Sequence, residues 1–105
     1  MANTTTLSQR FIMYNHNPRI TCTDGFTISV QAHSGSYCTR DDNGSPTHVE
    51  CGFPSTTPKT VELRSFAELF HPANYTNTVY GWVPVEVVQA ELDAHGGILD
   101  GCLPS

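Results

Sequence analysis

The sequence predicts a small α+β domain, in which an antiparallel sheet of four or five short strands is covered on one face by one main C-terminal helix. Three observations predict this class: a hairpin pattern around Asp24-Gly25, a second alternating run at residues 48–53, and helical spacing of apolar residues after Pro84. With 105 residues, of which 38% are apolar, we expect one modest hydrophobic core.

The start of the chain is polar and rich in threonine. Residues 1–9 have too few apolar side chains to offset the entropy of ordering, so we expect a flexible N-terminal arm followed by a single domain at residues 10–105. Residues 10–14 form a short apolar stretch that favours an edge strand, and the turn formers before Pro18 end it.

Two alternating runs surround Asp24-Gly25 and indicate a hairpin. A two-residue loop there would place the apolar side chains of the two runs on opposite faces. A three-residue loop instead pairs Cys22 with Phe26 and makes one face wholly apolar. We therefore predict the three-residue loop, with Gly25 in the left-handed conformation of a bulge.

The middle of the chain begins with loop material. Residues 32–46 are rich in glycine, serine, asparagine and aspartate, which favours a loop around one short strand. Residues 48–53 alternate, which predicts a strand whose buried face carries Val49, Cys51 and Phe53.

A linker and a short helix are expected next. Residues 54–58 carry two prolines and are interpreted as a surface linker. Residues 65–70 are predicted to be helical, because Ser65 followed by Glu68 resembles a capping box.

The C-terminal part has the clearest pattern. Residues 78–83 are β-branched and aromatic, which predicts a strand, and Pro84 is expected in the first turn of a helix over residues 84–95. The glycine pair at 96–97 is typical of a helix C-cap, and the apolar tail after it can dock on the core or add a strand. The apolar stripe of this helix consists of Val85, Val88 and Leu92.

Charge and hydropathy exclude two classes of partner. Ten acidic and five basic residues give a net charge of −5, and the basic residues are scattered, so we expect no direct nucleic-acid binding. No apolar run approaches the ~20 residues of a membrane-spanning helix, and the polar start does not resemble a signal peptide. We therefore expect a cytoplasmic protein without membrane contact.

Cysteine and histidine side chains are the candidates for metal binding and nucleophilic catalysis in this sequence. The only compact pair, His48 and Cys51, would point to opposite faces of a strand, so we expect no metal and no cofactor. Cys38 lies beside Arg40 and near His33 and His48, which makes a cysteine-dependent enzyme the enzymatic alternative. The sequence lacks a recognisable catalytic arrangement, so we expect no enzymatic activity. In a cytosolic chain the cysteines are expected as free thiols, whereas an exported chain would allow three alternative pairings into two disulfides. These cysteines are Cys22, Cys38, Cys51 and Cys102.

A small-nucleotide site is a further alternative. The sequence has neither a P-loop nor a glycine-rich dinucleotide fingerprint. Aromatic side chains on loops could still stack a base, although aromatic residues on strands usually belong to the core. The aromatic residues considered are Tyr37, Phe53, Tyr75, Tyr80 and Trp82.

Several segments resemble a set of small, uncharacterised phage and prophage proteins. The resemblance covers roughly residues 20–98 and is carried above all by Thr78-Val-Tyr-Gly-Trp-Val-Pro-Val-Glu-Val-Val and His95-Gly-Gly-Ile, together with Tyr37-Cys-Thr-Arg-Asp-Asp. It implies no reaction, cofactor or catalytic residue. It implies a setting in which small accessory proteins bind and inhibit a host factor, such as a CRISPR effector, and this is an association with no mechanism attached.

The leading hypothesis is a non-enzymatic, anti-CRISPR-like accessory protein that binds and inhibits a host defence protein. Alternatives are a sponge for a small nucleotide signal and a phage structural protein, and a homodimer is left open. The acidic surface would steer toward a basic partner. Loops 32–44 and 74–82 are the expected contact surfaces. The candidate binding residues are Tyr37, Arg40, Asp41, Asp42, Tyr75 and Trp82.

Overall fold

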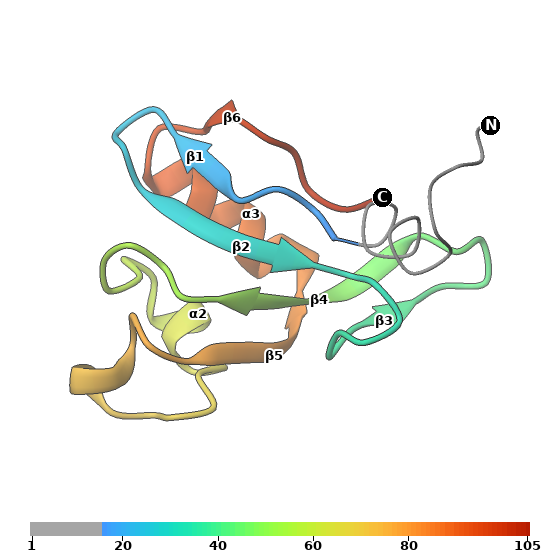
Figure 1. The fold of residues 1–105 in the computed structure, drawn as a ribbon, viewed down its shortest axis with the longest axis horizontal. Coiled ribbons are helices and arrows are strands. Elements are labelled where there is room, and N and C mark those ends of the chain that lie inside the picture. Colours follow the sequence, from blue (N-terminus) through green and yellow to red (C-terminus); the bar gives the residue numbers. More distant parts are fainter. Residues whose placement is uncertain (1–15) are drawn as a thin grey trace, which may run out of the picture.

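The fold is α+β, as predicted, with a six-stranded antiparallel sheet and one main helix (Figure 1). It is a computed structural model that describes residues 16–105, so the predicted arm at 1–9 and edge strand at 10–14 lie outside the described residues. The elements are β1 (Ile20–Cys22), β2 (Thr27–Gln31), β3 (Thr39–Arg40), β4 (Pro46–Gly52), α2 (Val61–Arg64), the 3-10 helix η1 (Pro72–Asn74), β5 (Val79–Pro84), α3 (Val85–Ala94) and β6 (Ile98–Asp100).

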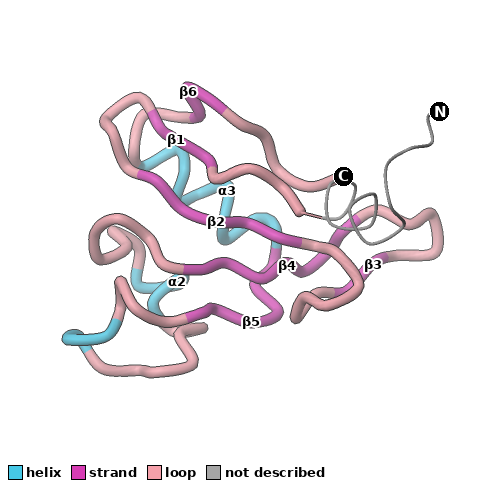
Figure 2. The backbone as a smooth tube through the Cα atoms, in the orientation of Figure 1, coloured by secondary structure: helices cyan, strands magenta, loops and turns pink. Residues whose placement is uncertain are grey.

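The strand β4 is the centre of the sheet. The strands follow the order β3-β4-β2-β1-β6, and β5 also pairs with β4, so β4 contacts three other strands (Figure 2). The described part contains six strands, where the sequence predicted four or five, because β3 has only two residues and β6 forms from the C-terminal tail. The sequence analysis allows for both, as one short strand within residues 32–46 and as a strand added by the tail.

The first hairpin confirms the predicted three-residue loop. Ile20 pairs with Ile28, and the Cys22 backbone N–H donates to the Phe26 carbonyl at 2.8 Å. Gly25 has φ +94°, a conformation that residues with a Cβ rarely adopt. The apolar side chains of both strands therefore face the same core.

The strand β4 confirms the burial of Val49 and Cys51, but the placement of Phe53 was wrong. The Phe53 side chain is 50% exposed. The β4–β5 register shifts between Val49 and Cys51, β4 ends at Gly52, and Phe53 has a positive φ of 50°. The alternation of the strand therefore stops before Phe53, which turns its ring away from the core.

The predicted linker at residues 54–58 is on the surface only in its middle. Residues 55–57 are exposed, as predicted, but Pro54 and Pro58 at its two ends are fully buried and anchor it to the core. Two prolines restrict the chain and carry no N–H, which lowers the cost of burying an irregular backbone.

The helix predicted at residues 65–70 lies instead at Val61–Arg64. Thr60 is its N-cap, and the Thr60 hydroxyl oxygen accepts the Leu63 N–H at 3.2 Å. Ser65 is the C-cap, with its hydroxyl donating to the Glu62 carbonyl at 2.6 Å. The serine is therefore a cap, but at the other end of the helix from the one predicted.

The strand β5 and the helix α3 lie close to their predicted positions. Pro84 is the last residue of β5 and the N-cap of α3, so it precedes the first turn in which it was expected. After the C-cap, the Gly97 N–H donates to the Leu92 carbonyl at 2.9 Å and the Gly96 N–H donates to the Asp93 carbonyl at 3.0 Å. These two bonds form a Schellman motif, so the predicted glycine C-cap is confirmed.

One hydrophobic core lies between the sheet and the two α-helices. Val88 and Leu92 of α3 are fully buried against it, and β6 closes the sheet by pairing with β1. Within residues 16–105, no helix has the length and apolar character needed to cross a bilayer. The largest side chains in the core are Tyr80, Ile20, Ile28, Leu63 and Leu92.

Candidate functional site

Two of the predicted binding residues, Tyr37 and Trp82, form a stacked pair on the surface. Their ring centroids are 4.7 Å apart and the ring planes differ by 14°. The side chains remain 43% and 53% exposed, respectively. Aromatic rings of this size are normally buried on at least one face, so a stacked and exposed pair is a candidate contact surface.

The backbone fixes the position of this pair from three segments of the chain. The Trp82 N–H donates to the Tyr37 carbonyl at 3.0 Å. The Tyr37 N–H in turn donates to Glu50 Oε1 at 2.8 Å. Because β4, β5 and the loop before β3 all hold the pair, its geometry is present before any partner binds.

A β-bulge in β5 turns Trp82 outward. Between its pairs with β4, β5 carries two residues, Gly81 and Trp82, opposite the single residue Glu50. Trp82 has φ +49°, a conformation that costs a residue of this kind on the order of 1–3 kcal/mol. The bulge therefore holds the Trp82 side chain outward at a cost in backbone strain.

Gly81 leaves space for the Tyr37 ring. A Cβ atom at position 81 would lie 3.2 Å from the ring atom Cδ2 of Tyr37, which is closer than most real Cβ contacts. A larger residue at this position would therefore push the Tyr37 ring and disturb the stack.

Arg40, the second residue of β3, has a structural role. Its guanidinium donates to the Ala32 carbonyl at 2.8 Å, to the Ser105 carbonyl at 3.3 Å and to the Gly44 carbonyl. These bonds tie the β3–β4 hairpin to the segment after β2 and to the C-terminal tail.

The two acidic candidates lie in the β3–β4 turn. Asp41 Oδ1 accepts the N–H groups of Asn43 at 2.9 Å and Ser45 at 3.0 Å, which closes the turn. Asp42 is exposed at the same turn. Asp41 is thus a turn residue, and Asp42 is an exposed charge in the same turn.

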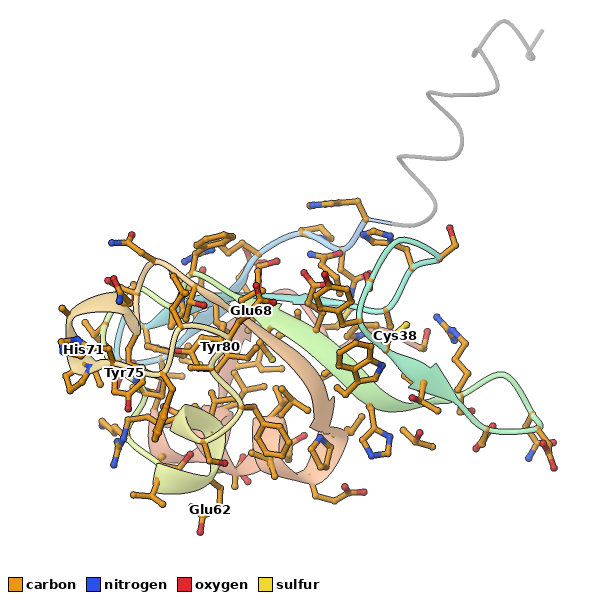
Figure 3. All side chains as sticks on the ribbon, turned by 90° about the horizontal axis from the view of Figure 1, so that it is seen from below. Cys38, Glu62, Glu68, His71, Tyr75 and Tyr80 are labelled. Atoms are coloured by element: carbon orange, nitrogen blue, oxygen red, sulfur yellow. The ribbon has the colours of Figure 1, made fainter. Side chains whose placement is uncertain are left out.

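Tyr75 does not join the exposed pair. Its side chain is 8% exposed and belongs to the core, and its carbonyl accepts the Tyr80 hydroxyl. Burial raises the pKa of Tyr80. Figure 3 shows Tyr75, Tyr80 and His71 together at one end of the domain, with Cys38, the residue after Tyr37, toward the other end. We therefore leave Tyr75 out of the contact surface.

An open cleft of about 610 Å³ lies beside the loop that follows β2. The Cys38 thiol faces the His33 carbonyl at 3.6 Å, and His33 Nδ1 accepts the Gly35 N–H at 3.1 Å. The imidazole therefore positions the turn, and the thiol is held by the backbone of His33 and not by its ring. The cleft is lined by Ala32, His33, Ser34, Ser36, Cys38 and Arg40.

A buried charged network, which the sequence reasoning missed, ties α3 to the first hairpin. His95 Nδ1 lies 2.8 Å from Asp24 Oδ2, and His95 Nε2 lies 2.8 Å from Glu91 Oε2. Phe26 stacks on the His95 ring with centroids 3.7 Å apart. Both ring nitrogens of His95 therefore lie within hydrogen-bond distance of a carboxylate oxygen, and the ring bridges the two acidic side chains.

Glu91 is fully buried and is satisfied on both oxygens. Its Oε1 accepts the Thr60 N–H at 2.9 Å and the Thr60 hydroxyl at 2.8 Å, and its Oε2 also accepts the Lys59 N–H at 2.7 Å. Burial by itself would raise the pKa of Glu91, but the bonds from Thr60, Lys59 and His95 outweigh it, so the pKa is lowered.

The Asp24 carboxylate completes the network at the surface. The Phe26 N–H and the His95 ring both bond to it, and they lower its pKa below the usual value. Lys59 Nζ lies 3.7 Å from Asp24 Oδ2 and adds a positive charge to the network. The network has no open coordination position or substrate access, since Glu91 and His95 are both buried, and it acts as an electrostatic link between α3, the linker and the hairpin.

A single local signal for this network exists in the sequence. Glu91 and His95 are four residues apart, so they share one face of α3. Glu91 lies next to Leu92 of the apolar stripe, which places a carboxylate at the edge of the buried face. Neither spacing nor composition identifies Thr60 or Asp24 as partners, because these residues are far away in the sequence.

The remaining candidates in the described part of the chain are metal ligands and cysteines. Among residues 16–105, no three histidine, cysteine or acidic side chains converge in a way that could hold a metal ion. The four cysteines in this part are all unpaired, and Cys22 and Cys51 are buried.

Comparison with known proteins adds no relative. No protein-family model, curated protein or solved structure matches this chain.

Proposed function

We propose that this chain is a non-enzymatic binding protein that contacts another protein through the Tyr37–Trp82 pair. The observation that carries the proposal is the exposed stack itself, built on a strained bulge and fixed by hydrogen bonds from two other segments. Tryptophan and tyrosine are the residues most enriched at the energetic centres of protein interfaces. A preformed pair loses little side-chain entropy on binding, which favours affinity.

The proposed partner is a host defence protein in the bacterial cytoplasm, which the chain would inhibit by occupying its surface in a stoichiometric complex. The setting comes from the phage resemblance of the sequence, and the net charge of −5 supports a partner with a basic surface. Inhibition by occlusion needs affinity and position but no reactive group.

The experiment is affinity capture from a bacterial lysate with a tagged wild-type chain and two variants. Trp82→Ala removes the larger ring of the pair. Leu99→Ala removes an apolar side chain of β6 that is 69% exposed, against 53% for Trp82, and serves as the matched control. We expect one protein to be recovered with both the wild type and Leu99→Ala. The amount recovered with Trp82→Ala should be at least tenfold lower, which corresponds to a loss of about 1.4 kcal/mol or more in binding free energy. Equal recovery with both variants would refute the proposed surface.

A second candidate function is the capture of a small anionic ligand, such as a nucleotide. The observation in its favour is the open cleft lined by Arg40, two serines and His33, whose groups can donate hydrogen bonds to an anion. Release of a nucleotide when the purified protein is heated would favour this candidate. A nucleotide-free preparation that still captures a protein would favour the first.

A further inference from the structure

We propose that the Tyr37–Trp82 pair receives an arginine side chain of the partner, with Glu50 supplying the opposite charge. This inference rests on the proposed protein-binding function and adds the chemistry of the contact. It makes the site a cation–π receptor placed on the sheet face that points away from the core.

The aromatic part of this receptor is open to a planar cation. Both rings are about half exposed and lie nearly parallel. A cation over the face of an indole or phenol ring is attracted by the ring quadrupole, and tryptophan is the strongest of these acceptors. A guanidinium also stacks on such a surface, which an ammonium group does not, so arginine fits better than lysine.

The acidic part is the Glu50 carboxylate. Glu50 lies between the buried residues Val49 and Cys51 of β4, so its side chain is on the opposite face of the sheet from the core. Its Oε1 accepts the N–H of Tyr37, which places the carboxylate directly beside the residue that carries one of the two rings. The remaining oxygen, Oε2, has no hydrogen-bond or ion-pair partner among residues 16–105.

Within residues 16–105, no basic side chain pairs with Glu50. The two ion pairs of Asp24 and the one of Glu91 are the only ones formed there, and none includes an arginine. Arg19, Arg40 and Arg64 donate to carbonyl or hydroxyl oxygens, as with Arg64 and the Pro58 carbonyl at 2.6 Å. The carboxylate that is bonded to the Tyr37 backbone therefore has one oxygen that can receive a cation from a partner.

The single tryptophan makes this inference directly measurable. Trp82 is the only tryptophan in the chain, so indole fluorescence reports on this site alone. The probe is an amidated tetra-arginine peptide, titrated into the full chain at low salt. We expect a saturable change in Trp82 emission with tetra-arginine, binding at least about twofold weaker with tetra-lysine, and no change with tetra-glutamate.

Two variants separate the receptor from general attraction to an acidic protein. Glu50→Gln keeps an oxygen that can accept the Tyr37 N–H but removes the charge, and we expect it to weaken tetra-arginine binding about threefold. Glu62→Gln removes the same charge from an exposed position on α2, which Figure 3 shows well away from Cys38, and we expect affinity within about 1.3-fold of the wild type.

The outcomes are distinct. Equal weakening by Glu50→Gln and Glu62→Gln, equal binding of tetra-lysine, or an unchanged emission with tetra-arginine would each overturn the arginine receptor. Any of these results together with Trp82-dependent capture from the lysate would leave the proposed function standing. Loss of Trp82-dependent capture with normal tetra-arginine binding would refute the proposed function and leave the receptor.

Discussion

Replacing Glu91 by glutamine tests the buried network most severely. The change keeps the size of the side chain and removes one acceptor oxygen and the charge. In the native structure each oxygen of Glu91 accepts two donors, Oε1 from Thr60 and Oε2 from Lys59 and His95. A glutamine must turn its NH₂ group toward one of these donor pairs.

The cost follows from the groups left without an acceptor. If the NH₂ group replaces Oε2, a His95 ring nitrogen can accept from it, but the Lys59 N–H stays unpaired. If it replaces Oε1, the Thr60 N–H loses its acceptor instead. One buried unpaired N–H costs about 1–3 kcal/mol, and the loss of charge-assisted bonds adds to it. We expect Glu91→Gln to lower the free energy of unfolding by about 2–4 kcal/mol.

The assay is urea denaturation at neutral pH, with thermal melting as a second readout. The expected loss corresponds to a decrease in Tm of roughly 10–25 °C for a domain of this size. The matched control is Asp93→Asn on the exposed face of the same helix, where the amide oxygen can still accept from Gln89, and we expect a change below about 0.5 kcal/mol. If Glu91→Gln unfolds within 0.5 kcal/mol of the control, on the same order as an ordinary surface substitution, the network does not stabilise the fold as argued.

Three further predictions follow from the same contacts. The lowered pKa values of Asp24 and Glu91 mean that the unfolded chain binds more protons than the folded one in acid, so stability should fall as the pH drops below roughly pH 5. The fall should be shallower in Glu91→Gln, as measured by urea denaturation at each pH. Gly96 and Gly97 share φ +87°, but only a Cβ at Gly96 would collide, because it would lie 2.1 Å from the Thr23 hydroxyl of the β1–β2 turn. Gly97→Ala should therefore lower the free energy of unfolding by about 1–2 kcal/mol and Gly96→Ala by clearly more. Equal Tm values for the two variants would contradict the placement of α3 against that turn. Trp82→Gly relieves backbone strain but loses the ring stack, so the free energy of unfolding should change by less than about 1 kcal/mol although partner capture is lost. A loss of stability above about 2 kcal/mol, the size expected for a core substitution, would make Trp82 a structural residue.

Local patterns predicted those parts of the fold in which one residue decides between alternatives. The hairpin register was predictable because a one-residue slip would have exposed a row of apolar side chains, and only Gly25 accommodates the resulting turn. The end of α3 was predictable because Gly96 and Gly97 form a local motif whose bonds span six residues. In both regions, the information lies within a few residues.

Long-range contacts decided the parts that the sequence did not predict. Thr60, and not Ser65, begins the helix α2, because the N–H and hydroxyl of Thr60 are fixed by Glu91, which lies 31 residues away. Phe53 leaves the core because the strand ends at a positive φ that no alternation pattern can reveal. Tertiary contacts override local preference in these places.

The candidate site was predicted as separate residues and not as an arrangement. Tyr37 and Trp82 were both identified as candidates from their loops, but their contact depends on the bulge in β5 and on the carbonyl–amide bond between them. The alternation at residues 48–53 implies only that Glu50 lies on the strand face opposite Val49 and Cys51. Its bond to the Tyr37 N–H, which brings a charge to the aromatic pair, is visible only in three dimensions.

Hydrogen–deuterium exchange of the chain, alone and in complex with the captured partner, tests the binding surface most directly. We predict that the complex slows exchange at residues 36–38 and 80–83, where the loop before β3 meets the bulge of β5, and leaves β6 and α2 unchanged. Slower exchange confined to β6 or α2, with residues 36–38 and 80–83 exchanging as in the free chain, would contradict the account.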